Sequence, residues 1–262
     1  MTRSIGSTLV AVAAMVMTAS GCSDSTGPGG AGEQVSVRMA AVVPTGAGAS
    51  VEGDALVLTG SNGTLQIDEL YVVMDEFELK RADDDHCVEE DDSCEKFRAG
   101  PAFLNVPLDG SGVIAVQQAV DTGTYARLDF EIDDVDDDEE NAAKAAQVTA
   151  LRTEIRSQFP DWPQDASMLV VGTFTPAGGT AVAFRVYFEA EVEVEMRLQP
   201  PVVIDASATS PSFTVRIDAA MLFRNGDGSV RNLALLDFGA TGSVIDFEVE
   251  IENGISEIEF DD

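Results

Sequence analysis

Strict alternation of apolar and polar residues is the feature that most limits how this chain can fold. It recurs in four runs, at residues 124–133, 182–198, 213–223 and 245–251. In the run 182–198, phenylalanine and aliphatic residues share one parity, and most residues of the other parity are glutamate or arginine. One buried and one solvated face is typical of strands in antiparallel sheets. The chain is therefore predicted to be all-β, with the architecture of an antiparallel β-sandwich.

Turn signals separate these runs. Residues 61–63 (Ser-Asn-Gly) and 225–228 (Asn-Gly-Asp-Gly) contain the Asn and Gly residues that accept a positive φ, so each predicts a hairpin turn. Pro200 and Pro201 follow the run 182–198. Because proline cannot donate to a strand ladder, these two residues are predicted to end that strand.

Residues 141–159 are the one segment with helical periodicity. The acidic residues 136–140 precede it, where the helix dipole favours negative charge, and Pro160 follows it. An amphipathic helix is expected here as an insertion into the β pattern, packed across one edge or end of a sheet. Its apolar residues at helical spacing are Val148, Leu151, Ile155 and Phe159.

The N-terminus has the order of a secretory signal peptide. Arg3 precedes an apolar run at residues 9–17, and small residues lead to Cys22. The run is too short to cross a bilayer as a mature helix. The segment ending at Gly21-Cys22 resembles the lipobox of bacterial lipoproteins, although Ala19 stands where Leu is usual. Residues 1–21 are therefore predicted to be removed, and Cys22 to be acylated.

This interpretation divides the chain into three parts. Residues 22–34 are rich in Gly, Ser and Pro and are expected to form a flexible tether. Residues 35–262 are expected to form the β-sandwich domain that carries the helical insertion. An exported protein with an acyl group on Cys22 belongs to the bacterial cell envelope, and we expect attachment to the outer membrane.

Two further cysteines, Cys87 and Cys94, lie in a polar, acidic segment. If Cys22 carries lipid, these two remain as a pair, and an oxidising envelope favours a disulfide between them. The alternative is a metal site that combines both thiols with His86. Zinc usually has four N or S ligands, and the chain contains no other histidine or free cysteine for it. The disulfide is therefore the preferred prediction.

The formal net charge is −32, from 47 acidic and 15 basic residues, and removal of Arg3 with the signal peptide makes it −33. This balance excludes nucleic acid as a partner, because phosphate binding needs clustered Lys and Arg. An anionic lipid surface would also repel the domain, so the acyl chains on Cys22 are the predicted membrane contact. Solubility and self-repulsion are the simplest consequences of the charge.

The acidic run at residues 133–140 is a candidate calcium site, with Asp134, Asp136 and Asp138 as its ligands. It lacks the spaced carboxylates and distal glutamate of a calcium loop, so a solvated charge run before the helix is preferred. Residues 225–229 resemble half of a calcium loop. Phe223 and Ala234 stand where the first and last acidic ligands belong, and a plain turn is preferred there too. No metal ligand set is predicted.

Two other features have alternative explanations. Asp75 and Glu76 interrupt an apolar strand at residues 70–79, so they either mark a site together with Tyr71 or form a β-bulge or a protected edge. The bulge or edge is preferred. Trp162 lies between two prolines and is either a sugar-stacking platform or a packing anchor, of which the anchor is preferred.

Several stretches resemble a family of uncharacterised bacterial lipoproteins with a β-sandwich domain of unknown function. Residues 67–79 (IDELYVVMDEFEL) resemble an early strand of that family, and residues 123–128 (GTYARL) are similar to its G-T-Y-x-x-(I/L)-R-L strand, with the arginine displaced. Residues 172–174 and 183–186 look like its later sheet. The resemblance covers much of residues 35–250, implies a β-sandwich and implies no catalytic residues. The helix at 141–159 departs from the pattern.

No nucleophile elbow, metalloprotease motif or nucleotide-binding loop occurs, and His86 has no recognisable catalytic partner. We therefore expect a non-enzymatic, lipid-anchored envelope protein that acts as a binding or structural module, without catalytic residues or a cofactor. The alternative is a calcium- or carbohydrate-dependent adhesion or binding domain. Convergence of Asp75, Glu76 and Tyr71 in a cleft would favour a binding role.

Overall fold

The computed structural model describes residues 32–42, 46, 48–82, 95–135, 142–205 and 211–261. Several predictions concern residues outside these ranges and remain predictions. They are the signal peptide at 1–21, most of the tether at 22–34, acylation of Cys22, the disulfide between Cys87 and Cys94, and the calcium ligands Asp136 and Asp138.

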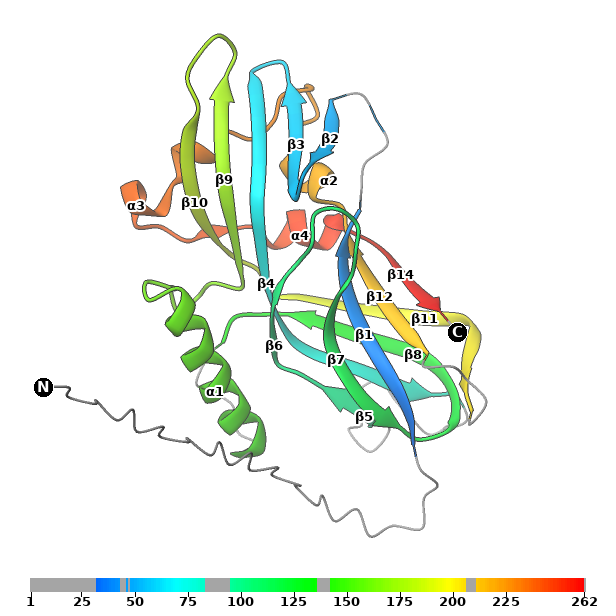
Figure 1. Ribbon diagram of the computed structural model, residues 1–262. Coiled ribbons are helices and arrows are strands. Elements are labelled where there is room, and N and C mark those ends of the chain that lie inside the picture. Colours follow the sequence, from blue (N-terminus) through cyan, green and yellow to red (C-terminus); the bar gives the residue numbers. More distant parts are fainter. Residues whose placement is uncertain are drawn as a thin grey trace, which may run out of the picture.

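A large sheet organised around one long strand forms most of the fold (Figure 1). The central strand, β4, pairs with β3 and β9 in its first half and with β5 and β8 in its second half. Within the described residues this sheet consists of β2 (Ala49–Glu52), β3 (Ala55–Gly60), β4 (Gly63–Arg81), β5 (Glu95–Ala99), β6 (Ala102–Asn105), β8 (Gly123–Ile132), β9 (Met168–Pro176), β10 (Val182–Glu189), β11 (Val192–Ile204) and β13 (Ile245–Asp246).

A smaller sheet has the order β14-β12-β1-β7, with bounds β1 (Glu33–Ala41), β7 (Val113–Val120), β12 (Ser212–Ile217) and β14 (Ile255–Asp261). Strands β1 and β12 pair in parallel, as do β10 and β13. The prediction of a purely antiparallel fold is therefore wrong, and the sheets are mixed. Alternation in sequence reports which face of a strand is buried, but it does not report the direction of the neighbouring strand.

One hydrophobic core joins the two sheets. Val37 of β1 and Phe213 of β12 belong to the same buried cluster as Phe77 of β4 and Leu128 of β8. The rings of Phe77 and Phe213 have centroids 5.8 Å apart, so the two sheets are in direct contact. The expectation of a β-rich fold is confirmed.

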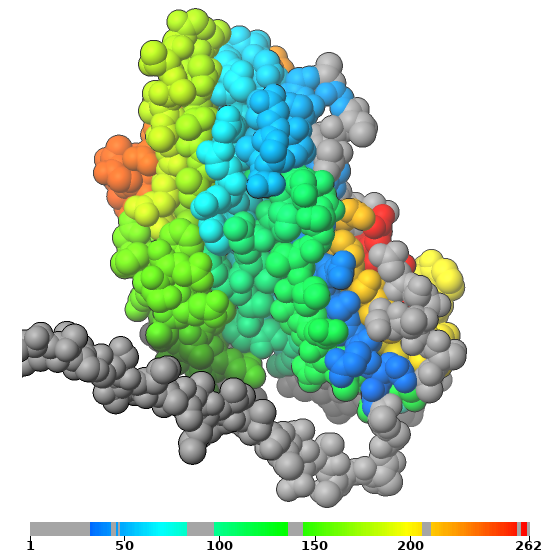
Figure 2. All heavy atoms as spheres, viewed as in Figure 1, coloured from blue at the N-terminus to red at the C-terminus, as the bar shows by residue number. Residues whose placement is uncertain are grey.

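The predicted helix is present as α1 (Ala142–Gln158). It packs on the face of the large sheet that lies opposite the main core, where Val73 of β4, Leu169 of β9 and Tyr187 of β10 are buried. The helix therefore covers a face of the sheet, and not an edge or end as predicted. Its side chains pack against neighbouring strands at the lower left of the molecule in Figure 2. Its buried contact residues are Val148, Leu151 and Ile155.

The run 182–198 is two strands rather than one. Strand β10 ends at Glu189 and pairs with β9, whereas β11 begins at Val192 and pairs with β8. The alternation continues through the break because both strands bury the same parity against one core. Pro200 and Pro201 do not end the strand. They fall in a register shift between Arg197 and Val202, after which β11 continues.

The last two alternating runs contain helices that their pattern did not predict. Strand β12 gives way to α2 (Ala219–Phe223), where Asp218 caps the helix by accepting a hydrogen bond from the Met221 amide. Strand β13 is followed by α4 (Glu248–Gly254). Two other short helices, η2 (Leu233–Leu236) and α3 (Phe238–Thr241), lie between them. In the part of the chain that the structure describes, none of the helices has the length and apolar character needed to cross a membrane.

Both predicted turns are confirmed. Residues 61 and 62 connect β3 to β4, with Gly60 paired to Gly63. In the second turn the Asn225 amide donates to the Ser229 carbonyl. The two turns also contact each other, because the Asn62 side chain donates to the Val230 carbonyl and accepts from the Val230 amide.

Candidate functional site

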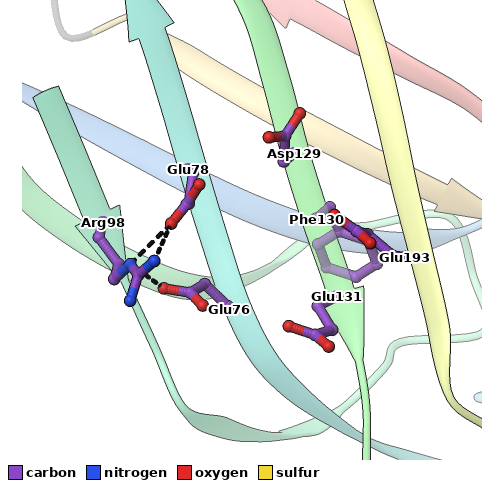
Figure 3. Close-up of a pocket in the computed structure, with 7 residues that line it drawn as sticks. All are labelled: Glu76, Glu78, Arg98, Asp129, Phe130, Glu131 and Glu193. Atoms are coloured by element: carbon purple, nitrogen blue, oxygen red, sulfur yellow. Dashed lines mark hydrogen bonds and ion pairs between the residues drawn. The ribbon is translucent and has the colours of Figure 1, made fainter. Parts of the chain in front are cut away.

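Two rows of carboxylates cross the outer face of β4, β8 and β11 (Figure 3). The pairing register places residues of the same charge directly opposite one another on adjacent strands. Like charges in this position destabilise a sheet unless something compensates them. The first row is Glu76, Glu131 and Glu193, and the second is Glu78, Asp129 and Glu195.

A β-bulge brings a further carboxylate to the first row. The register of β4 against β8 shifts between Met74 and Glu76, so Asp75 is the extra residue. Gly100, at φ +141°, lies against this bulge, and a Cβ there would collide with the Asp75 carbonyl oxygen. Asp75, Glu76 and Glu131 can thus each place one oxygen within 4.8 Å of the others. We call this group the carboxylate cluster.

The two interpretations of Asp75 and Glu76 are therefore both partly correct. The predicted bulge is present, but it converges with Glu131 to make a candidate site. The edge interpretation is wrong, because β4 is paired on both sides in this region. Tyr71 is not part of the cluster. Its ring stacks on Phe103, at a centroid distance of 5.2 Å, in the apolar layer under α1.

Cations neutralise the second row more fully than the first. The Lys80 ammonium lies 2.5 Å from Asp129 Oδ2 and 3.3 Å from Glu78 Oε2. Arg98 on β5 forms ion pairs with Glu78 and Glu76 (Figure 3). Among the residues that the structure describes, Glu131 has no ion pair within 4 Å. A partly buried negative charge is therefore concentrated at the first row.

Helix α1 supplies a second cation to the carboxylate cluster, in addition to Arg98 of β5. Lys144 Nζ lies 2.9 Å from Asp75 Oδ2 and 3.9 Å from Glu76 Oε2. The helix that covers the aromatic layer therefore also reaches the acidic site. Because the Lys144 ammonium already pairs with two carboxylates of the cluster, a bound cation would compete with it.

Burial raises the pKa of both glutamates in the cluster. Loss of water raises the pKa of Glu76 to about 7, although the nearby Arg98 charge acts in the opposite direction. Loss of water, together with the charges of Asp75 and Asp133, raises the pKa of Glu131 to about 7. Near neutral pH these two glutamates are therefore partly protonated, and binding of a metal cation to the cluster would release the protons.

The cluster is reached from two adjoining clefts. One, of about 200 Å³, is lined by residues of both carboxylate rows and by Arg98. The other, of about 440 Å³, is lined by Asp75, Glu76 and Lys144 among other residues. All the donor atoms that the cluster offers are carboxylate oxygens. Hard cations such as calcium prefer oxygen donors, whereas zinc and copper favour nitrogen and sulfur.

The remaining sequence candidates lie elsewhere. Asp134 is outside the carboxylate cluster. In the turn at 225–229, Asp227 Oδ1 accepts hydrogen bonds from the Ser229 amide and hydroxyl, and these lower the pKa of Asp227. That carboxylate serves the turn, as predicted. Trp162 is only 7% exposed, and its Nε1–H donates to the Ala166 carbonyl, so the packing anchor is confirmed.

Sequence reasoning missed Glu131 as a site residue. It was recognisable as one of the polar positions of the run 124–133, but the pattern contains nothing that pairs it with Glu76.

Comparison of the chain with protein-family models, curated proteins and solved structures found no match.

Proposed function

We propose that this protein is a lipid-anchored protein of the bacterial envelope whose β domain is a non-enzymatic binding module with a calcium site at the carboxylate cluster. The convergence of Asp75, Glu76 and Glu131 carries the proposal. The lipobox-like segment ending at Cys22 supports export and anchoring. The core shared by the two sheets supports a sandwich arrangement of the kind that the lipoprotein resemblance implies.

Calcium fits the cluster for three reasons. Its ligands are carboxylate oxygens, it tolerates irregular coordination, and extracellular modules bind it with a Kd of roughly 10⁻⁴ to 10⁻³ M. The cluster supplies three of the six to eight oxygens that calcium takes, and water or carbonyl oxygens would complete the shell. A carbohydrate ligand has less support, because the buried Trp162 offers no exposed stacking face.

The test is thermal unfolding of the mature protein while calcium is titrated in a background of about 0.5 M sodium chloride. At this salt concentration the interactions between surface charges are strongly screened. A specific site predicts stabilisation that begins near Kd and grows with the logarithm of the calcium concentration, reaching ~2.7 kcal/mol at calcium about 100 times Kd. That corresponds to a Tm rise of roughly 5–10 °C for a domain of this size. Asp75→Asn and Glu131→Gln should each remove the rise.

Glu189→Gln is the matched control, since it removes the same charge at an exposed position on β10 and should keep the calcium response. A second variant tests the role of α1. Lys144→Gln should tighten calcium binding, because it removes the competing ammonium, whereas Arg156→Gln on the same helix should not. If calcium does not shift the Tm of the wild type, the protein has no calcium site and the proposal is refuted.

A further inference from the structure

Strand β11 is the last strand of the large sheet. Within the described ranges it pairs with β8 alone, so its other backbone edge has no strand partner (Figure 1). Val194 packs against the core but is only half-buried. Helix α4 also contacts β11, without pairing with it as a strand. Pro200 and Pro201 lack N–H groups, so the usable edge ends before them. The open part of this edge is therefore residues 193–198.

The side chains along this edge are strongly acidic on one face. Glu193 and Glu195 end the two carboxylate rows, and both residues are exposed. At the opposite end of the second row, Arg98 on β5 provides a cation beside the glutamates of β4 (Figure 3). Among the described residues, Arg127 of β8 pairs with Glu195, and no cation forms an ion pair with Glu193. A strand added at β11 with cationic side chains on this face would compensate the negative charges at the β11 end of both rows.

A second copy of this chain is a poor occupant for this edge. Each copy carries a formal charge of −32, so two copies repel each other at long range. A basic segment is attracted by the same field. Edge strands without a covering element are known to accept extended peptides, with backbone hydrogen bonds giving affinity and alternate side chains giving specificity.

We propose that residues 193–198 of β11 accept an extended basic segment of a partner protein as an added strand, with Lys or Arg side chains opposite Glu193 and Glu195. This interaction goes beyond the calcium site and does not require it, because neither Glu193 nor Glu195 belongs to the carboxylate cluster, although Glu193 lies opposite Glu131 on β8.

The experiment uses an acetylated, amidated peptide of alternating Lys and Val, with binding to the mature protein measured by calorimetry near physiological salt. A second peptide of the same sequence carries N-methyl groups on alternate residues, on the side that would face β11. It keeps the charges but loses the backbone donors. We expect the N-methylated peptide to bind at least tenfold more weakly, and Glu193→Gln combined with Glu195→Gln to weaken the unmodified peptide at least tenfold.

Glu189→Gln should leave peptide binding unchanged. Equal binding of both peptides would show that the acidic surface attracts cations without strand addition and would overturn the proposal. A dimer of the mature protein in light scattering, lost in the Glu193 and Glu195 variant, would overturn it in favour of a second copy. Calcium titration of Glu195→Gln alone separates the two proposals, because Glu195 lies in the second row, outside the carboxylate cluster, and this variant should keep the calcium response.

Discussion

Replacing Glu131 by glutamine should stabilise the folded protein above pH 7 and flatten the pH dependence of its stability. Glu131 lies between Glu76 and Glu193 in the first carboxylate row, and burial raises its pKa from 4.5 to about 7. Glutamine has nearly the same shape but no charge. The substitution therefore removes the cost of ionising this position while it keeps the packing of β8.

The sign follows from proton binding. Because the pKa of Glu131 is higher in the folded state than its ordinary value, the folded protein binds more protons than the unfolded chain between about pH 4.5 and 7. Stability therefore falls as the pH rises through this window. A pKa change from 4.5 to about 7 corresponds to ~3 kcal/mol. Solvent reaches this cleft and screens the charges, so we expect ~1–2 kcal/mol.

The assay is urea unfolding of wild type and variant at about pH 8 and about pH 5.5, a range that contains the raised pKa values. The variant should be more stable than wild type by ~1–2 kcal/mol at the higher pH and by much less at the lower pH. Glu189→Gln corrects for the general relief of negative charge and should shift stability only slightly. If the stability of wild type and Glu131→Gln depends on pH in the same way, the pKa of Glu131 is not raised in the folded protein and the reasoning is refuted.

Four other outcomes are expected. Gly100→Ala should destabilise the protein by ~2 kcal/mol in urea unfolding, because its Cβ meets the Asp75 carbonyl at a positive φ; an unchanged midpoint would contradict the bulge geometry. Trp162→Ala should cost ~3–5 kcal/mol in the same assay. A fatty-acid probe should label wild-type cells but not Cys22→Ala. Intact mass should rise by the mass of two hydrogen atoms on reduction if Cys87 and Cys94 form a disulfide.

The sequence pattern predicted the elements whose hydrogen bonds and stop signals lie within their own segment. The helix at 142–158 was predictable because its apolar spacing and its proline stop are local properties. The turns at 61–63 and 225–228 were predictable for the same reason. The helices α2 and α4 were not, since their alternating residues also suit a strand, and the cap from Asp218 is seen only with the folded backbone.

The sequence alone determined that the chain is β-rich and acidic, and it located Asp75 and Glu76 as a break in an apolar strand. Only the tertiary structure decided that this break faces Glu131, because strand register depends on contacts between residues more than 50 positions apart. The tertiary structure also decided the two parallel pairings and the position of β11 at the end of the large sheet. A period of two specifies which face of a strand is buried, whereas the neighbours of each strand follow from the packing of the whole core.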